Sequence, residues 1–180
     1  LNYFKKNSNH LIIKNKKIID EISKKNKPVI FISGHFANYE LMSMELTKSN
    51  IKLATIYRPL NNIFLNPFME YLRKTFVCKN QIKKGLNGVK EALNFMKKGY
   101  SVALMVDQRV GEGPRVKFFD GEAHTTTLPA QLSSRFNCDI VPIYIARDEN
   151  DIFELEILDP IEISENIRSN KELVTRRINE

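Results

Sequence analysis

Cysteine and long apolar runs are both scarce in this sequence. The two cysteines, Cys78 and Cys138, have no CxxC partner and no metal-ligand spacing. We therefore expect two reduced thiols, not a disulfide framework or a zinc site. No apolar run approaches the ~18 residues of a membrane-spanning helix. The sequence is therefore neither that of a disulfide-stabilised scaffold nor that of a bundle of spanning helices.

Several catalytic and binding motifs are also missing. The sequence contains no Walker A loop, no Gly-x-Ser-x-Gly nucleophile motif, no zinc-ligand cluster and no EF-hand loop. The pair Gly111-x-Gly113 lacks the third glycine and the following helix of a dinucleotide-binding turn. No local pattern therefore points to a bound nucleotide or metal.

The composition describes a globular protein with an uneven charge. Apolar residues make up 42% and charged residues 27% of the 180 residues, which suits a single domain spanning 1–180. The formal charge is +7: residues 1–27 carry a net +6, residues 73–98 a net +7 and residues 99–180 a net −6. This polarity suits an anionic partner, such as a lipid surface, a phosphorylated lipid or an acidic carrier protein. It is equally compatible with solvated, lysine-rich helix faces.

Short apolar segments alternate with segments of helical periodicity. The predicted strands are 28–32, 53–57, 101–106, 116–119, 140–146 and 153–158. The predicted helices are 10–26, 38–48, 66–76, 89–98, 128–136 and 171–180, with Asn38, Asn66 and Thr127 as capping residues. This alternation predicts an α/β fold with a mostly parallel central sheet flanked by helices.

The segment after the first buried strand carries the most distinctive side chains. Gly34 ends the strand, so His35 lies on a strand-to-helix turn at the carboxyl end of a strand, where open α/β sheets bind ligands. Glu40 follows in the first helical turn, where the helix dipole favours an ionised carboxylate. A carboxylate bonded to one imidazole nitrogen fixes the tautomer and leaves the other nitrogen as a base. His35 and Glu40 are therefore a candidate dyad for taking a proton from a hydroxyl, or else a structural histidine and a helix-terminus charge.

Four other polar residues are candidates for ligand binding. Arg58 follows a strand and precedes Pro59, so its guanidinium could bind phosphate, stabilise an oxyanion or form a strand-end salt bridge. Arg73 could likewise bind phosphate or stabilise an oxyanion, or it could be a solvated helix arginine. Asp107 ends an apolar strand, where an unpaired charge is costly, so it should pair with an arginine or belong to the site. Gln108 beside it can only form hydrogen bonds.

Four sequence blocks together resemble the lipid A biosynthesis acyltransferases, the lauroyl and myristoyl transferases of the lysophospholipid acyltransferase superfamily. The blocks are His-Phe-Ala-Asn-Tyr-Glu at 35–40, Tyr-Arg-Pro-Leu-Asn-Asn at 57–62, Asp-Gln at 107–108, and Phe-Phe-Asp-Gly at 118–121 leading to Thr-Thr-Thr at 125–127. They follow the order of that family and span roughly residues 28–145. The wider superfamily more often carries His-x4-Asp where this sequence has His-x4-Glu.

This resemblance implies a glycerolipid acyltransferase-like fold and an O-acyltransferase. The enzyme would move a fatty acyl chain from an acyl thioester, on acyl carrier protein or as acyl-CoA, to a hydroxyl of a lipid A precursor. The implied catalytic residues are His35 as general base and Glu40 as its orienting carboxylate. The implied substrate-binding residues are Arg58, Arg73, Asp107 and Gln108. Direct attack of a hydroxyl on a thioester requires no cofactor and no metal.

The resemblance also implies a location and a longer parent protein. We expect the cytoplasmic face of a bacterial inner membrane, with the anionic membrane surface as a partner and no nucleic acid. Members of the family resemble a longer protein with an N-terminal membrane anchor and a further C-terminal segment. The sequence starts at Leu1 and not at a methionine, so we expect it to be a fragment.

Two rival functions stay open at this point. One is an acyltransferase that acts on a glycerophospholipid or a mannosyl lipid, and the other is a non-catalytic basic α/β domain that binds lipid or nucleic acid. An enzyme should bring His35, Glu40, Arg58 and Asp107 together beside an apolar groove. A binding module should instead present a continuous Lys/Arg face remote from His35.

Overall fold

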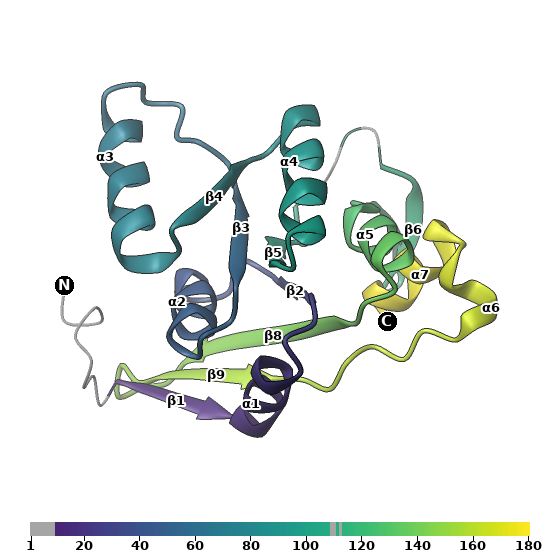
Figure 1. The fold of residues 1–180 in the computed structure, drawn as a ribbon, viewed down its shortest axis with the longest axis horizontal. Coiled ribbons are helices and arrows are strands. Elements are labelled where there is room, and N and C mark those ends of the chain that lie inside the picture. The colour runs from purple at the N-terminus through teal and green to yellow at the C-terminus, as the bar shows by residue number, and fades with distance from the viewer. Residues whose placement is uncertain (1–9, 109–110, 112) are drawn as a thin grey trace.

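A seven-stranded sheet forms the centre of the molecule (Figure 1). The structure is a computed structural model that describes residues 10–108, 111 and 113–180. In spatial order the strands are β1 (Leu11–Lys14), β9 (Phe153–Ile157), β8 (Ile140–Arg147), β2 (Ile30–Ser33), β5 (Ser101–Met105), β3 (Leu53–Tyr57) and β4 (Asn80–Lys83). Within this sheet β8 and β9 pair antiparallel, and every other neighbouring pair is parallel. The predicted α/β fold with a mostly parallel sheet is confirmed.

Helices cover both faces of the sheet. They are α1 (Lys16–Lys25) and α2 (Glu40–Lys48) on one face, and α4 (Leu86–Lys97), α5 (Leu128–Phe136) and α7 (Lys171–Asn179) on the other. Phe31 of β2 packs in the first core with side chains of α1 and α2, and its neighbour Ile32 packs in the second core with α4, α5 and α7. Because β2 is buried on both faces, Ile30, Phe31 and Ile32 are consecutive apolar residues and the strand does not alternate.

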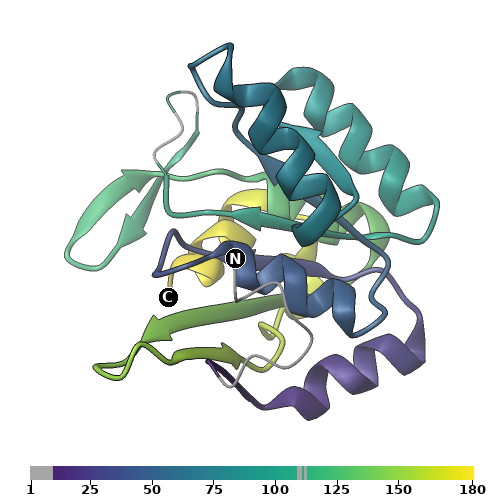
Figure 2. The same cartoon turned by 90° about the vertical axis from the view of Figure 1, so that its left-hand side faces the viewer.

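Two smaller elements extend from this core. Strands β6 (Arg115–Phe118) and β7 (Gly121–His124) form a separate antiparallel hairpin, which projects from the molecule in Figure 2. The Asn179 side chain of α7 ties the hairpin down by donating to the Lys117 carbonyl at 3.3 Å and to the Thr125 hydroxyl at 3.1 Å. The short helix α6 (Glu165–Arg168) precedes α7.

Helix α3 (Leu65–Leu72) lies at the outer margin of the molecule and continues directly into a π-helical turn, Arg73–Val77 (Figure 1). A π-helical turn accommodates an extra residue and commonly occurs at functional sites. In the described part of the chain, no helix combines the length and the apolar character that crossing a bilayer requires.

The helix predicted over residues 10–26 is wrong in its first half. Residues Leu11–Lys14 form the edge strand β1, which pairs with β9, and only Lys16–Lys25 is helical. Asn15 separates the two with a left-handed backbone conformation (φ 57°). Three consecutive apolar residues fit either period, and the pairing with β9 is a long-range contact that local periodicity cannot reveal. Residues 1–9 and Glu112, which belong to the predicted basic N-terminal segment and the predicted Gly111–Gly113 turn, lie outside the described residues.

The helix starts differ from the predicted caps. Helix α2 begins at Glu40, and Asn38 contributes only its carbonyl, which accepts from the Leu41 N–H at 3.1 Å. Before α3, the capping side chain is Asn62, which accepts from two backbone N–H groups, those of Phe64 and Leu65. Asn66, the predicted cap, lies inside α3. Asn61, Asn62 and Asn66 are all possible caps within six residues, so the start of α3 was ambiguous from sequence.

Gly88 allows α4 to lie close against β4. A Cβ at this position would sit 2.0 Å from the Lys83 carbonyl oxygen, a backbone atom that cannot rotate away. We expect Gly88→Ala to lower the free energy of unfolding by about 1–3 kcal/mol, although alanine favours a helix over glycine by roughly 1 kcal/mol. Urea unfolding measures this. The control is Asn87→Ala, an exposed neighbour on the same helix, which should change stability little. A Gly88→Ala variant as stable as the parent would contradict this packing.

Candidate active site

The parallel register of β2 and β5 places Asp107 opposite His35. Ser33 pairs with Met105 at the carboxyl ends of these strands, and His35 and Asp107 each lie two residues further on. The carboxylate contacts His35 twice: Oδ2 accepts from the backbone N–H at 2.8 Å, and Oδ1 lies 2.8 Å from the imidazole Nδ1. Two contacts fix both the position and the orientation of the ring.

The charge state of Asp107 fixes the tautomer of His35. Partial burial by itself would raise the pKa of Asp107, but the hydrogen bonds from the His35 backbone and imidazole outweigh it and hold the pKa below its usual value. An ionised carboxylate can only accept, so Nδ1 carries the proton and Nε2 keeps its lone pair. The Gln108 amide nitrogen lies 3.4 Å from Nε2, and the Tyr39 ring contacts the imidazole edge-on at 4.7 Å. Asp107 therefore orients the imidazole so that Nε2 is the nitrogen on the side of Gln108.

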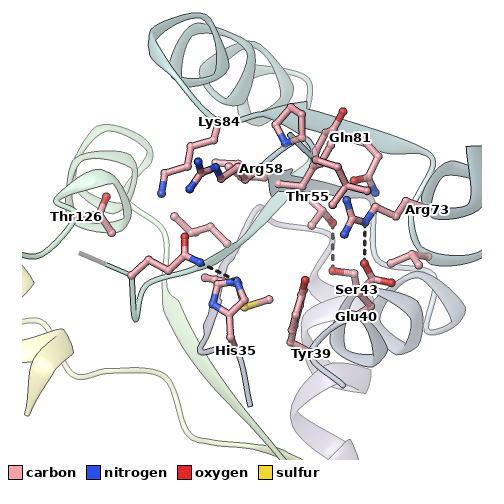
Figure 3. Close-up of a pocket in the computed structure, with 18 of the residues that line it drawn as sticks. His35, Tyr39, Glu40, Ser43, Thr55, Arg58, Arg73, Gln81, Lys84 and Thr126 are labelled. Carbon is pink, nitrogen blue, oxygen red and sulfur yellow. Dashed lines mark hydrogen bonds and ion pairs between the residues drawn. The ribbon is translucent and has the colours of Figure 1, made fainter. Parts of the chain in front are cut away.

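The structure corrects the expected partner of His35. No hydrogen bond joins His35 to Glu40, because the Glu40 carboxylate accepts instead from Nε of Arg73 at 2.7 Å. In Figure 3 the Tyr39 ring stands between His35 on one side and the Glu40–Arg73 pair on the other. The five-residue spacing that suggested a dyad brings both residues to one cavity but not into contact.

Arg73 is largely buried and is not a solvated helix arginine. Its side chain is 11% exposed, and its guanidinium lies 5.6 Å from the centre of the Tyr57 ring. It is the first residue of the π-helical turn after α3. Its Nη1 atom is buried without a hydrogen-bond partner among the described residues. Because a buried unpaired N–H is costly, this atom is a candidate donor to a ligand.

The pairing of β3 with β4 brings two positively charged residues to the same edge of the sheet. Tyr57 of β3 pairs with Lys83 of β4, so the next residues, Arg58 and Lys84, follow the carboxyl ends of neighbouring strands. The Lys84 N–H donates to the Tyr57 carbonyl at 2.9 Å, which continues the pairing by one step. Arg58 forms no ion pair with any residue that the structure describes, so the strand-end salt bridge considered for it is not found there.

These side chains surround one cavity of about 420 Å³ (Figure 3). His35, Glu40, Arg58, Arg73 and Gln108 all line it, and Asp107 lies behind the imidazole. Its apolar wall comes from Leu60, Val77, Leu104, Met105 and Leu128. Figure 3 shows Arg58 and Lys84 extending toward the side of the cavity on which His35 lies. A basic imidazole, two cations and an apolar wall therefore meet in one space.

Sequence reasoning missed several polar residues of the cavity. Lys84 and Gln81 belong to β4 or its end, and β4 was not predicted because its sequence, Asn-Gln-Ile-Lys, contains one apolar residue. The Oε1 atom of Gln81 is buried with no partner among the described residues. Ser43 and Thr55 also line the cavity and bond to each other at 3.2 Å.

The described residues contain no cluster of three or more His, Cys, Asp or Glu side chains that could hold a metal ion. The polar groups of the cavity are instead one imidazole, a carboxylate–guanidinium pair, two cations and uncharged hydroxyl and amide groups. Such a set can move a proton and stabilise negative charge on a bound substrate.

The contact between His35 and Asp107 should make stability depend on pH. The folded-state pKa of Asp107 is depressed, so its contribution is fully present above the ordinary value of about 3.9 and is lost as the pH falls through the lower folded value. We expect Asp107→Asn to be less stable than the parent at pH 7, by at most about 1 kcal/mol, because 33% and 35% of the two side chains stay exposed. The gap between the two proteins should begin to narrow as the pH falls below about 3.9 and should close as it passes through the lower folded value.

Urea unfolding between pH 7 and pH 3 measures this difference. The matched control is Asp159→Asn, which alters an exposed carboxylate in a loop. A gap between Asp107→Asn and the parent that is constant over this range would argue against an ionised Asp107 bonded to His35.

The comparison with known families agrees with this site. The chain matches the family of bacterial lipid A biosynthesis acyltransferases over residues 4–180, which is almost its full length. No curated protein matches the chain. A match of this extent establishes the family and, with it, the class of enzyme. The chain belongs to the bacterial lipid A biosynthesis acyltransferase family and is an acyltransferase.

Proposed function

We propose that this enzyme transfers a fatty acyl chain from an acyl thioester to a hydroxyl group of a lipid A precursor, with His35 as the general base. The observation that carries the proposal is the contact between His35 Nδ1 and Asp107 Oδ1 at 2.8 Å beside a cavity that also holds Arg58 and Lys84. The family supports the acyl transfer and the class of acceptor.

The imidazole first takes a proton from the acceptor and later gives it to the leaving group. Nε2 of His35 takes the proton of the acceptor hydroxyl while the hydroxyl oxygen attacks the thioester carbonyl. The carbonyl electrons move to its oxygen and form a tetrahedral oxyanion. When this intermediate collapses, the C–S bond breaks, and the imidazolium returns its proton to the thiolate leaving group. Asp107 stabilises the imidazolium between the two transfers.

The positive groups of the cavity have two tasks. Arg58 and Lys84 lie on the side of His35, where they stabilise the oxyanion or a phosphate group of the acceptor. Arg73 offers its unpartnered Nη1 to the substrate, while Gln108 orients the attacking hydroxyl near Nε2. In this proposal Glu40 acts through Arg73: it holds the guanidinium in place and does not touch the imidazole.

The basic segment 73–98 indicates the kind of acyl donor, and the lipid acceptor indicates the location of the enzyme. The segment 73–98 has a formal charge of +7, which suits an acidic acyl carrier protein better than a neutral donor and also admits acyl-CoA. Because a lipid A precursor is a membrane lipid, we place the enzyme at the cytoplasmic face of a bacterial inner membrane. A glycerophospholipid or mannosyl lipid acceptor would use the same residues, so only a panel of acceptors separates these substrates.

The non-catalytic alternative is disfavoured by the arrangement of the site. A binding module should keep its basic face away from His35. Here Arg58 and Lys84 line the same cavity as His35, together with an apolar wall. This is the arrangement expected of an enzyme that must hold an acyl chain and a charged lipid at one base.

Replacing His35 should abolish transfer without unfolding the protein. His35→Ala removes the base, and we expect kcat to fall roughly a hundred- to ten-thousandfold. The assay follows transfer of a radiolabelled acyl group from acyl carrier protein to a detergent-solubilised lipid A precursor. His124→Ala is the matched control, because His124 lies on the hairpin β6–β7 and does not line the cavity. Equal rates for His35→Ala and the parent would refute the proposal.

A second pair of variants separates the roles of the two carboxylates. Asp107→Asn should lower kcat on the order of 10²–10⁴-fold, because the amide can leave the imidazole in the wrong tautomer. Glu40→Gln should mainly raise KM for the acceptor and leave kcat nearly unchanged, because Arg73 loses the charged partner that holds it in place. The opposite pattern, a large fall in kcat for Glu40→Gln and none for Asp107→Asn, would assign the orientation of the base to Glu40.

A further inference from the structure

Helix α3 has its polar and apolar faces reversed. Asn66, Glu70 and Arg73 recur at the i, i+4, i+7 spacing of one helix face, and all three bond to other parts of the protein. Most large apolar side chains of the segment instead face solvent, Met69 and Leu72 are half-buried, and α3 contributes no fully buried residue. A surface helix of a water-soluble protein normally shows the opposite arrangement.

A polar network attaches α3 to the sheet. Glu70 bonds to the Tyr57 hydroxyl of β3, accepts from Nδ2 of Asn66 at 2.8 Å and pairs with Lys83 of β4 at 3.1 Å. The hydrogen bond from Tyr57 and that from Asn66 lower the pKa of Glu70 to about 2. Burial, followed by the bond to Glu70, raises the pKa of Tyr57. Because these groups hold the inner face, the apolar outer face is not needed to keep α3 in place.

The outer face is an almost continuous apolar surface. Its side chains are 53–86% exposed, and they are Ile63, Phe64, Leu65, Phe68 and Tyr71. Phe64, Phe68 and Tyr71 share one face at the i, i+4, i+7 spacing. Five large exposed side chains within nine residues are costly in water, and such a patch commonly marks a binding surface.

Positive charge adjoins this surface. Lys74, Lys79 and Lys84 are exposed on the turns that follow α3 and β4. Between Arg58 and Lys84 the one acidic residue is Glu70, and it faces inward in the polar network. Aromatic and aliphatic side chains next to lysines are the combination that binds the interface of an anionic bilayer, where rings enter the headgroup region and ammonium groups meet lipid phosphates.

We propose that residues 63–71 insert their apolar side chains into the surface of an anionic lipid bilayer, with α3 lying parallel to it. The segment is bordered in sequence on both sides by residues that line the cavity, 58–61 before it and Arg73 after it. Docking by this face therefore places the cavity at the lipid surface, where an acceptor can enter with its chains still in the membrane. The entry of a lipid acceptor from the membrane rests on the proposed function. The binding of α3 to a bilayer does not depend on it.

The test uses vesicle co-sedimentation of the 180-residue chain, with no substrate. The variant is the double substitution Phe64→Ser and Phe68→Ser on the outer face of α3. We expect its partition coefficient onto phosphatidylglycerol vesicles to fall roughly 10- to 100-fold, since each ring loses its apolar contact with lipid. The matched control is Phe119→Ser in the turn of the hairpin β6–β7, an 80% exposed phenylalanine; β6 lies on the opposite side of Figure 1 from α3, so this variant should bind like the parent.

Varying the salt concentration and the lipid charge separates the contribution of the lysines to vesicle binding from that of the aromatic rings. The parent should bind phosphatidylglycerol vesicles more strongly than phosphatidylcholine vesicles at low salt. At 1 M salt the Debye length is only ~3 Å, so the lysines contribute little and the residual binding should be that of the rings. The double variant should then bind neither vesicle type. Circular dichroism and the Tm verify that the variant is folded.

Three results would overturn the proposal. These are parental binding by the folded double variant, an equal loss of binding in Phe119→Ser, or no vesicle binding by the parent chain. If the double variant binds vesicles normally but has a raised KM for acyl carrier protein, the face docks the carrier and not a bilayer. His35→Ala should bind vesicles like the parent, so failure of the proposed chemistry and failure of the docking surface give different results.

Discussion

The backbone hydrogen bonds that hold β2, β5, β3 and β4 parallel and in register determine where every charged group of the cavity lies. Parallel strands end at the same edge of a sheet, so residues that follow different strands at equal distances become neighbours. The pairing of Ser33 with Met105 brings His35 to Asp107, and the pairing of Tyr57 with Lys83 brings Arg58 to Lys84. A one-residue slip between either pair of strands would separate these groups and reverse which side chains face the core.

The same constraint explains which parts of the site could be predicted from sequence. The buried strands are apolar runs, so β2, β3, β5, β8 and β9 and the polar residues at their ends could be located, which identified His35, Arg58 and Asp107. The partner of His35 could not be predicted from sequence, because the order of strands in a sheet and their register are set by contacts between residues far apart in the chain. Glu40 was assigned to His35 since it is near in sequence, whereas Asp107 is near in space.

Weakly apolar elements escaped prediction for a related reason. Strand β4 contains one buried residue, Ile82, and depends on its neighbour β3 for hydrogen bonds. Lys84 and Gln81 were missed with it. The π-helical turn that begins at Arg73 leaves no distinct signal in sequence, so the contacts of Arg73 with Glu40 and Tyr57 could not be predicted. A helix over 66–76 was predicted, but its sequence does not reveal which of its faces turns toward the core.

The place of β1 at the sheet edge also affects the order in which the protein folds. Among the described strands β1 is synthesised before the others, yet its partner is β9, and Leu11 pairs with Phe153. Strands β2, β5, β3 and β4 can associate with one another as soon as Ser101–Met105 has left the ribosome, and β2 then waits only for β8 on its other side. β1 must remain unpaired for most of translation, with its backbone N–H and C=O groups available to another chain. Lys14 at the end of β1 and Lys16 and Lys17 just after it keep this exposed segment charged until β9 has been made, which opposes aggregation of the nascent chain.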